Sequence, residues 1–143
     1  MYPHLTCFLV DDDEDDRDIF RIALNDLNLN VQLYEAENGL DALQKLPPCT
    51  NFLPDFIFID LNMPIMGGKE LLIEIRANEK LKHIPVIICS TSDYLKHVKE
   101  TEALRASLYF VKPSSIQKLT ETLSAIFRKE QMEFFLPERT FYY

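Results

Sequence analysis

Short apolar runs alternate with amphipathic stretches along nearly the whole chain, and this alternation limits the possible folds more than any other feature. The runs cover residues 7–10, 31–35, 56–59, 86–89 and 108–111. Each has the length of a strand, and all but the second are almost entirely apolar, as is typical of strands buried on both faces. We therefore predict five strands, and we expect the mixed run at 31–35 to lie nearer an edge of the sheet.

The stretches between these runs carry apolar residues at helical spacing, which predicts helices. The first three contain Ile19, Phe20, Ala23, Leu24 and Leu27, then Leu40, Leu43 and Leu46, then Leu71, Leu72 and Ile75. The last contains Ile116, Leu119, Leu123, Ile126 and Phe127. A fourth stretch, over about residues 94–105, has a thinner apolar stripe. We expect the helix formed by this stretch to be the least firmly anchored.

A strand followed by a helix, repeated five times, predicts an α/β fold. Right-handed crossovers favour a doubly wound (βα)5 arrangement, in which one five-stranded parallel sheet lies between two helical layers, α/β/α. With 143 residues and 47% apolar content, the chain is expected to form a single domain over 1–143, with its core at about 5–128. The aromatic tail at 132–143 could pack back on this domain or form a dimer face, and both possibilities stay open.

The charge and the cysteines exclude several classes of function. A formal net charge of −8 argues against direct binding of nucleic acid or of an anionic membrane surface. No segment approaches the roughly 18 apolar residues of a membrane span, and the apolar run near the N-terminus is too short for a signal peptide. The odd cysteine count suits a reducing compartment, and Cys7 and Cys89 fall within apolar runs. We therefore expect a cytoplasmic protein with those two thiols buried.

Polar residues follow four of the predicted strands at the point where each strand ends. Asp11, Asp12 and Asp13 follow the first strand, Asp60 the third, Ser90 and Thr91 the fourth, and Lys112 with Pro113 the fifth. Ligands of doubly wound sheets gather at the carboxyl ends of the strands. We therefore expect carboxylates, a hydroxyl and an ammonium group to meet at one edge of the sheet.

Several carboxylates held close together repel one another unless a cation offsets their charge. Mg²⁺ fits this set because it binds oxygen ligands, uses few protein carboxylates and keeps bound water. Ca²⁺ fits less well, since the acids do not have the spacing of its loop motif. The alternative for the acidic run at 11–16 is a solvated helix start, and we expect Asp15 and Asp16 to cap that helix.

A carboxylate beside a metal ion can attack phosphorus and form an aspartyl phosphate. Asp60 is the candidate nucleophile, since it stands alone at the end of the central apolar run. Phosphoryl transfer depends mainly on positioning and on neutralising the charge of the phosphoryl oxygens. Lys112 and the hydroxyl of Ser90 are the residues expected to supply this neutralisation together with the metal.

Four motifs resemble the receiver domains of two-component response regulators, the CheY-like family. They are Phe8-Leu9-Val10-Asp11-Asp12-Asp13, Ala36-Glu37-Asn38-Gly39, Asp60-Leu61-Asn62-Met63-Pro64 and Tyr109-Phe110-Val111-Lys112-Pro113. The resemblance covers nearly all of residues 5–128 and implies the flavodoxin-like strand order 2-1-3-4-5. It implies a regulatory domain that catalyses only its own phosphotransfer and dephosphorylation. Since no effector domain follows the last predicted helix, we expect a stand-alone response regulator.

The resemblance also assigns roles to residues of the site. It implies that a sensor histidine kinase, a phosphotransfer protein or a small acyl phosphate phosphorylates Asp60. Mg²⁺ would be bound by the side chains of Asp12 and Asp60 and by the backbone carbonyl of Asn62, while Asp11 would act through bound water. Lys112 would pair with the phosphoryl oxygens.

Ser90 and Tyr109 correspond to the switch residues of the family. The resemblance implies that the Ser90 hydroxyl moves toward the phosphoryl group and that the Tyr109 ring turns inward with it. The output surface would be the fourth helix, fifth strand and fifth helix, which would bind a downstream protein. The Lys112–Pro113 bond would be cis, as X-Pro bonds can be at modest cost.

Two departures from the family and two rival functions are visible. Gly67 stands where the family commonly has an acid, which predicts a weaker cap on the third helix, and a glycine before the fifth strand is missing. An interaction module without phosphorylation is one rival, although Asp12, Asp60, Ser90 and Lys112 are all present. An aspartyl-nucleophile phosphatase is the other, but Asn62 occupies the position of its second Asp. A flavin-binding protein fits less well still, because no phosphate-binding loop follows the first strand.

Overall fold

The computed structural model describes residues 4–92, 95–129 and 141–142. Strands and helices alternate as the sequence predicts. The strands are β1 (Leu5–Val10), β2 (Val31–Ala36), β3 (Phe56–Asp60), β4 (Val86–Ser90), β5 (Leu108–Val111) and β6 (Phe141–Tyr142). The helices are α1 (Glu14–Asn25), α2 (Gly39–Lys45), α3 (Gly68–Ala77), α4 (Leu95–Ala103) and α5 (Ile116–Lys129).

The strands form one parallel sheet in the order β2-β1-β3-β4-β5-β6. Its first five strands therefore have the expected order 2-1-3-4-5. The strand β2 lies at one edge, where its first five residues alternate between partly buried and exposed positions, whereas every residue of β3 and β4 is buried. The mixed composition of β2 thus reflects its edge position, as predicted.

The strand β6 is the element that the apolar pattern did not predict. Its two residues extend the sheet beside β5, where Phe141 pairs with Leu108 and Tyr142 with Tyr109. At the level of the backbone, this part of the aromatic tail packs back on the domain. The remaining residues of the tail lie outside the described residues.

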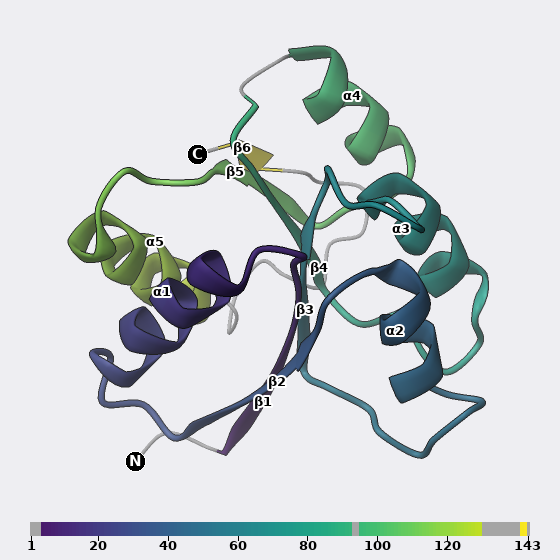
Figure 1. The fold of residues 1–143 in the computed structure, drawn as a ribbon, viewed down its shortest axis with the longest axis horizontal. Coiled ribbons are helices and arrows are strands. Elements are labelled where there is room, and N and C mark those ends of the chain that lie inside the picture. Colours follow the sequence, from purple (N-terminus) through teal and green to yellow (C-terminus); the bar gives the residue numbers. More distant parts are fainter. Residues whose placement is uncertain (1–3, 93–94, 130–140, 143) are drawn as a thin grey trace.

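The helices cover both faces of the sheet, with α1 and α5 on one face and α2, α3 and α4 on the other (Figure 1). Each face has its own apolar core. On the first, Phe20 of α1 and Phe127 of α5 both contact Phe58 of β3. On the second, residues of α2 and α3 pack against β1, β3 and β4. The predicted three-layer architecture is confirmed.

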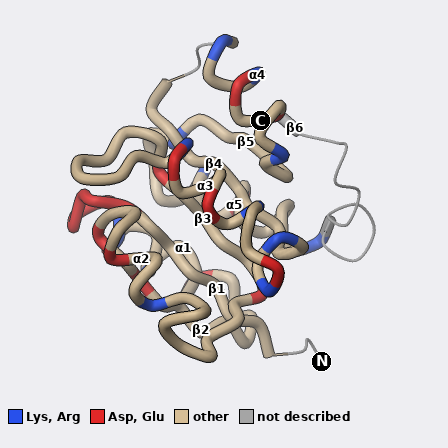
Figure 2. The backbone as a smooth tube through the Cα atoms, turned by 90° about the vertical axis from the view of Figure 1, so that its right-hand side faces the viewer, with Lys and Arg blue, Asp and Glu red and all other residues tan. Residues whose placement is uncertain are grey.

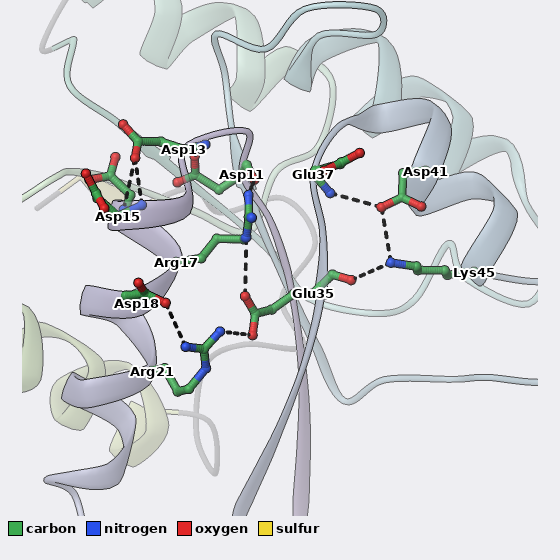
Figure 3. Close-up of polar contacts among 11 residues, drawn as sticks. Asp11, Asp13, Asp15, Arg17, Asp18, Arg21, Glu35, Glu37, Asp41 and Lys45 are labelled. Carbon is green, nitrogen blue, oxygen red and sulfur yellow. Dashed lines mark hydrogen bonds and ion pairs between the residues drawn. The ribbon is translucent and has the colours of Figure 1, made fainter.

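The first residues of α1 and α3 test the helix caps that the sequence predicts. The cap of α1 is Asp13, whose carboxylate accepts the backbone N–H groups of Asp15 and Asp16 at 2.9 and 3.2 Å (Figure 3). The prediction that Asp15 and Asp16 form the cap is therefore wrong: they are the second and third residues of the helix, which donate to a cap. The cap of α3 is Gly67, which offers no side-chain acceptor, as expected.

The helix α4 is anchored thinly, as predicted. Val98 and Thr101 are its buried residues, and Leu95 at its start is 63% exposed. An ion pair from Lys69 on α3 to Glu100 ties it to its neighbour. A helix with so little buried surface shifts more easily than one that is packed along a whole face.

Three further expectations concern single positions. Cys7 and Cys89 are buried free thiols, as predicted. The cis peptide bond of the described residues joins Pro47 to Pro48, so the expected cis bond at Lys112–Pro113 is not found. No helix in the described ranges has the length and apolarity needed to cross a membrane.

Gly68 packs directly on the strand that carries Asp60, and this contact generates a prediction. A Cβ atom at Gly68 would lie 2.5 Å from the backbone oxygen of Asp60 and 2.8 Å from the Cα of Leu61. Since backbone atoms cannot yield as a flexible side chain can, we expect Gly68→Ala to lower the free energy of unfolding by about 1–3 kcal/mol. Urea denaturation would measure this loss.

Gly67→Ala is the matched control for that substitution. A Cβ atom at Gly67 meets its nearest atom, the Leu61 oxygen, at 3.5 Å, which is an ordinary contact. The control should therefore unfold at close to the parent's urea concentration. Equal stability of the two variants would contradict the close packing of α3 on β3.

Candidate functional site

The carboxyl ends of β1, β3, β4 and β5 meet at one edge of the sheet. The pairing register places Asp60 beside Cys89 and Ser90 beside Val111. The backbone N–H of Lys112 then donates to the Ser90 carbonyl at 2.7 Å. The parallel arrangement thus gathers the polar residues that follow the strands, as the sequence predicts.

Three carboxylates form the centre of this site. One oxygen each from Asp11, Asp12 and Asp60 lies within 4.8 Å of the other two. Asp11 and Asp60 are buried, whereas Asp12 is exposed. An all-oxygen set with one open side fits Mg²⁺, which binds a few carboxylates and retains water molecules. The donor chemistry and the spacing therefore suit a divalent cation held by these three residues.

Burial and repulsion raise the pKa of the central carboxyl. Burial is the largest cause, and the charges of Asp11 and Asp12 add to it, whereas Lys112 and a backbone hydrogen bond from Asn62 act in the opposite direction; the pKa of Asp60 rises to about 7. Burial also raises the pKa of Asp11. The protein without a metal ion thus holds these carboxylates together at an energetic cost.

Lys112 lies among three carboxylates rather than beside one. Its Nζ donates to Oδ2 of Asp11 at 2.9 Å and to Oδ2 of Asp16 at 2.8 Å, and it lies 3.6 Å from Oδ1 of Asp60. Burial disfavours the ammonium form, but the hydrogen bonds to Asp16 and Asp11 outweigh it and raise the pKa of Lys112. Lys112 is therefore a fixed positive charge at the site.

Asp16 is a site residue that the sequence analysis assigned to another role. It was expected to cap α1, but its carboxylate accepts a hydrogen bond from Nζ of Lys112, which follows β5. The signal that could have found it is Asp13: a cap at that position puts Asp16 in the first helical turn, beside the edge of the sheet. Figure 2 shows the acidic run at the start of α1 in red.

The predicted switch residues are joined through Ser92. The hydroxyl of Ser90 accepts a hydrogen bond from the Ser92 backbone N–H at 3.1 Å, and the hydroxyl of Tyr109 donates to the Ser92 carbonyl at 2.6 Å. Both Ser90 and Tyr109 are fully buried. The Tyr109 ring therefore lies inward in this structure, and a shift of the segment after β4 would be felt by both residues.

Arg17 supports the site from outside, which the sequence analysis missed. Its guanidinium donates to the backbone carbonyl of Asp11 at 2.7 Å and lies 3.3 Å from Glu35 of β2. Arg21 also binds Glu35, at 2.6 Å, and Lys45 of α2 donates to the Glu35 carbonyl (Figure 3). These contacts tie the end of β1 to α1, β2 and α2, and so fix the backbone that carries Asp11.

The raised pKa of Asp60 predicts how stability varies with pH in the metal-free protein. An Asp carboxyl in the unfolded chain loses its proton near pH 4, whereas folded Asp60 keeps its proton until about pH 7. The folded state therefore binds more protons in this window, and the free energy of unfolding falls as pH rises through it.

Asp60→Asn removes this ionisation and should abolish that part of the pH dependence. At pH 8, without divalent cations, we expect the variant to be more stable than the parent by about 1–3 kcal/mol, and the gap should shrink toward pH 4. Urea denaturation across this range measures it. Asp18→Asn, which removes an exposed acid, is the control. If Asp60→Asn kept the pH dependence of the parent, the raised pKa of Asp60 would not be its cause.

Comparisons with known proteins agree with this geometry. The family model described as the response regulator receiver domain matches residues 7–124. The chemotaxis protein CheY-3 of Vibrio cholerae serotype O1 is 36% identical over 126 residues, which are 88% of this chain and 94% of that protein.

Solved structures of response regulators have the same fold. The phosphorylated cyanobacterial phytochrome response regulator RcpA has a TM-score of 0.80 and 27% identity, over 91% of this chain and 96% of that one. The Mn²⁺-bound response regulator Rcp1 has a TM-score of 0.77 and 27% identity, over 90% and 95% of the two chains. Receiver domains are regulatory and bind Mg²⁺ at an acidic site. The chain therefore belongs to the response regulator receiver domain family and is a response regulator of two-component signal transduction.

Proposed function

We propose that this protein is a phosphorylation-controlled switch in which Asp60 accepts a phosphoryl group from a sensor histidine kinase or a phosphotransfer protein. The observation that carries the proposal is the meeting of Asp11, Asp12 and Asp60 with the ammonium of Lys112. Such a site pairs a carboxylate nucleophile with the positive charge that phosphoryl transfer needs. Asp11, Asp12, Asp60 and the backbone carbonyl of Asn62 would hold Mg²⁺.

In the proposed reaction, an oxygen of the Asp60 carboxylate forms a bond to phosphorus while the bond from phosphorus to the donor breaks. The donor leaves as the imidazole of a histidine or, for acetyl phosphate, as acetate. Bound Mg²⁺ would supply positive charge to the phosphoryl oxygens. Lys112 would neutralise one of these oxygens, and the hydroxyl of Ser90 would donate a hydrogen bond to another.

The signal would then pass from Asp60 to a protein surface. A new dianion at Asp60 attracts the Ser90 hydroxyl, which now bonds to the Ser92 amide. The Tyr109 hydroxyl binds the carbonyl of that same Ser92, so a change at Ser90 alters the support of the Tyr109 ring. The surface of α4, β5 and α5 would bind the downstream protein or a second copy of the chain, and the thin anchoring of α4 supports this role.

We propose that residues 1–143 form one receiver domain, which works in the cytoplasm through protein partners and without direct contact to nucleic acid or membrane. The net charge of −8 supports the exclusion of polyanionic partners. Ile19 of α1 is 37% exposed and lines the same small cavity as Asp11, Asp16 and Lys112, so it would offer an apolar contact to the phosphodonor protein.

Treatment with acetyl phosphate and Mg²⁺ tests the proposal. The parent should give a retarded band in a phosphate-affinity gel, and Asp60→Asn should give none because it lacks the nucleophile. Lys112→Ala should reduce the band strongly, since it removes the positive charge beside Asp60. Asp18→Asn and a sample with a chelator are the positive and negative controls.

Two outcomes of this experiment would overturn the proposal. No band from the folded parent would favour an interaction module that has lost phosphorylation, especially if beryllofluoride with Mg²⁺ also leaves its spectrum unchanged. Sustained release of phosphate from a small phosphomonoester would instead favour an aspartyl-nucleophile phosphatase.

A further inference from the structure

We propose that Asp16 is a positioning residue for phosphotransfer at Asp60, which acts by anchoring the ammonium group of Lys112 from α1. This inference rests on the proposed function, since it concerns how Lys112 meets the phosphoryl group. The sequence motifs place the site residues at the strand ends, whereas Asp16 belongs to the helix α1. It is also the residue with the shortest ion pair to Lys112, at 2.8 Å.

Two of the three N–H groups of Lys112 can be assigned to hydrogen bonds within the site, and the third is directed to neither of these partners. An ammonium group has three N–H donors. Asp16 and Asp11 each accept a hydrogen bond from Nζ, at 2.8 and 2.9 Å, whereas the 3.6 Å to Oδ1 of Asp60 is too long for one. Phosphoryl oxygens added to Asp60 extend beyond its carboxylate, so the third donor can meet them without a rearrangement of Lys112.

Two anchors are needed because a lysine side chain is flexible. Its four-carbon stem carries about 2 kcal/mol of rotamer entropy, and a single contact leaves the ammonium free to pivot. Asp11 holds Lys112 from the end of β1, and Asp16 holds it from a second element. A group fixed before the reaction contributes more to the transition state than one that must be ordered during it.

Asp16 is itself held in place. Its backbone N–H donates to the capping carboxylate of Asp13 at 3.2 Å, so its position is set by the start of α1. The ion pair of Asp16 and Lys112 borders a small cavity of about 60 Å³, otherwise lined mainly by apolar residues that include Ile19 and Phe20. An apolar wall screens the pair less than water would and strengthens it. The charge of Asp16 therefore interacts mainly with the ammonium group of Lys112.

The opposite role for Asp16 makes the opposite prediction. If Asp16 drew Lys112 away from Asp60, or repelled the phosphodonor by its charge, then removing its charge would speed phosphorylation. Its side chain is 36% exposed, so its charge is partly screened toward an incoming donor, while its contact with Lys112 is direct. The direction of the change in rate therefore separates an anchor from a competitor.

The test compares Asp16→Asn with Asp15→Asn. Asp15 lies in the same first turn of α1 and is exposed, so its substitution removes the same charge without touching Lys112. With acetyl phosphate and Mg²⁺, we expect Asp16→Asn to be phosphorylated about three- to tenfold more slowly than the parent. Asp15→Asn should match the parent, and Asp16→Glu should recover part of the rate because it restores a carboxylate.

A second measurement follows Lys112 directly in the unphosphorylated protein. Side-chain NMR relaxation should show a lower order parameter for the Lys112 ε-methylene group in Asp16→Asn than in Asp15→Asn, whereas a merely structural role would leave it unchanged. Equal order parameters, or a phosphorylation rate of Asp16→Asn equal to or above that of Asp15→Asn, would overturn the inference and leave the proposed function standing. A parent that acetyl phosphate does not phosphorylate would overturn both.

Discussion

Mutual repulsion between the carboxylates of Asp11, Asp12 and Asp60 is the constraint on which the rest of this structure depends. Three such groups within 4.8 Å of one another oppose folding unless positive charge accompanies them. Lys112 supplies part of that charge and contacts two of the three. The charge that remains uncompensated is what makes the site suited to a divalent cation and to a phosphoryl group that arrives with it.

The rest of the fold holds these groups in place against their repulsion. The strands β3 and β4 are buried along their whole length, and each face of the sheet has its own apolar core. Gly68 lets α3 pack directly on the strand that ends at Asp60. Arg17 adds a brace on the backbone of Asp11. The cost of the site is thus offset by the packing of the whole domain, as is common for functional sites.

The same arrangement gives the site a connection to the surface. Ser90 and Tyr109 share Ser92 as a hydrogen-bond partner, which links a buried hydroxyl near the site to a buried ring on β5. The neighbouring helix α4 buries little of its surface. A small movement at the site can therefore be passed to α4, because shifting a helix with little buried surface between two positions costs little free energy.

The sequence by itself determined the architecture and most of the site. Apolar runs of strand length and helical spacing are local patterns, so they predicted five strands, five helices and the edge position of β2, and they placed Asp60, Ser90 and Lys112 at strand ends. Only the tertiary structure decided that Asp16 binds Lys112 and that β6 joins the sheet. The physical reason is separation along the chain: Asp16 and Lys112 are 96 residues apart, and a contact at that distance depends on how helix and sheet pack together, which no local pattern records.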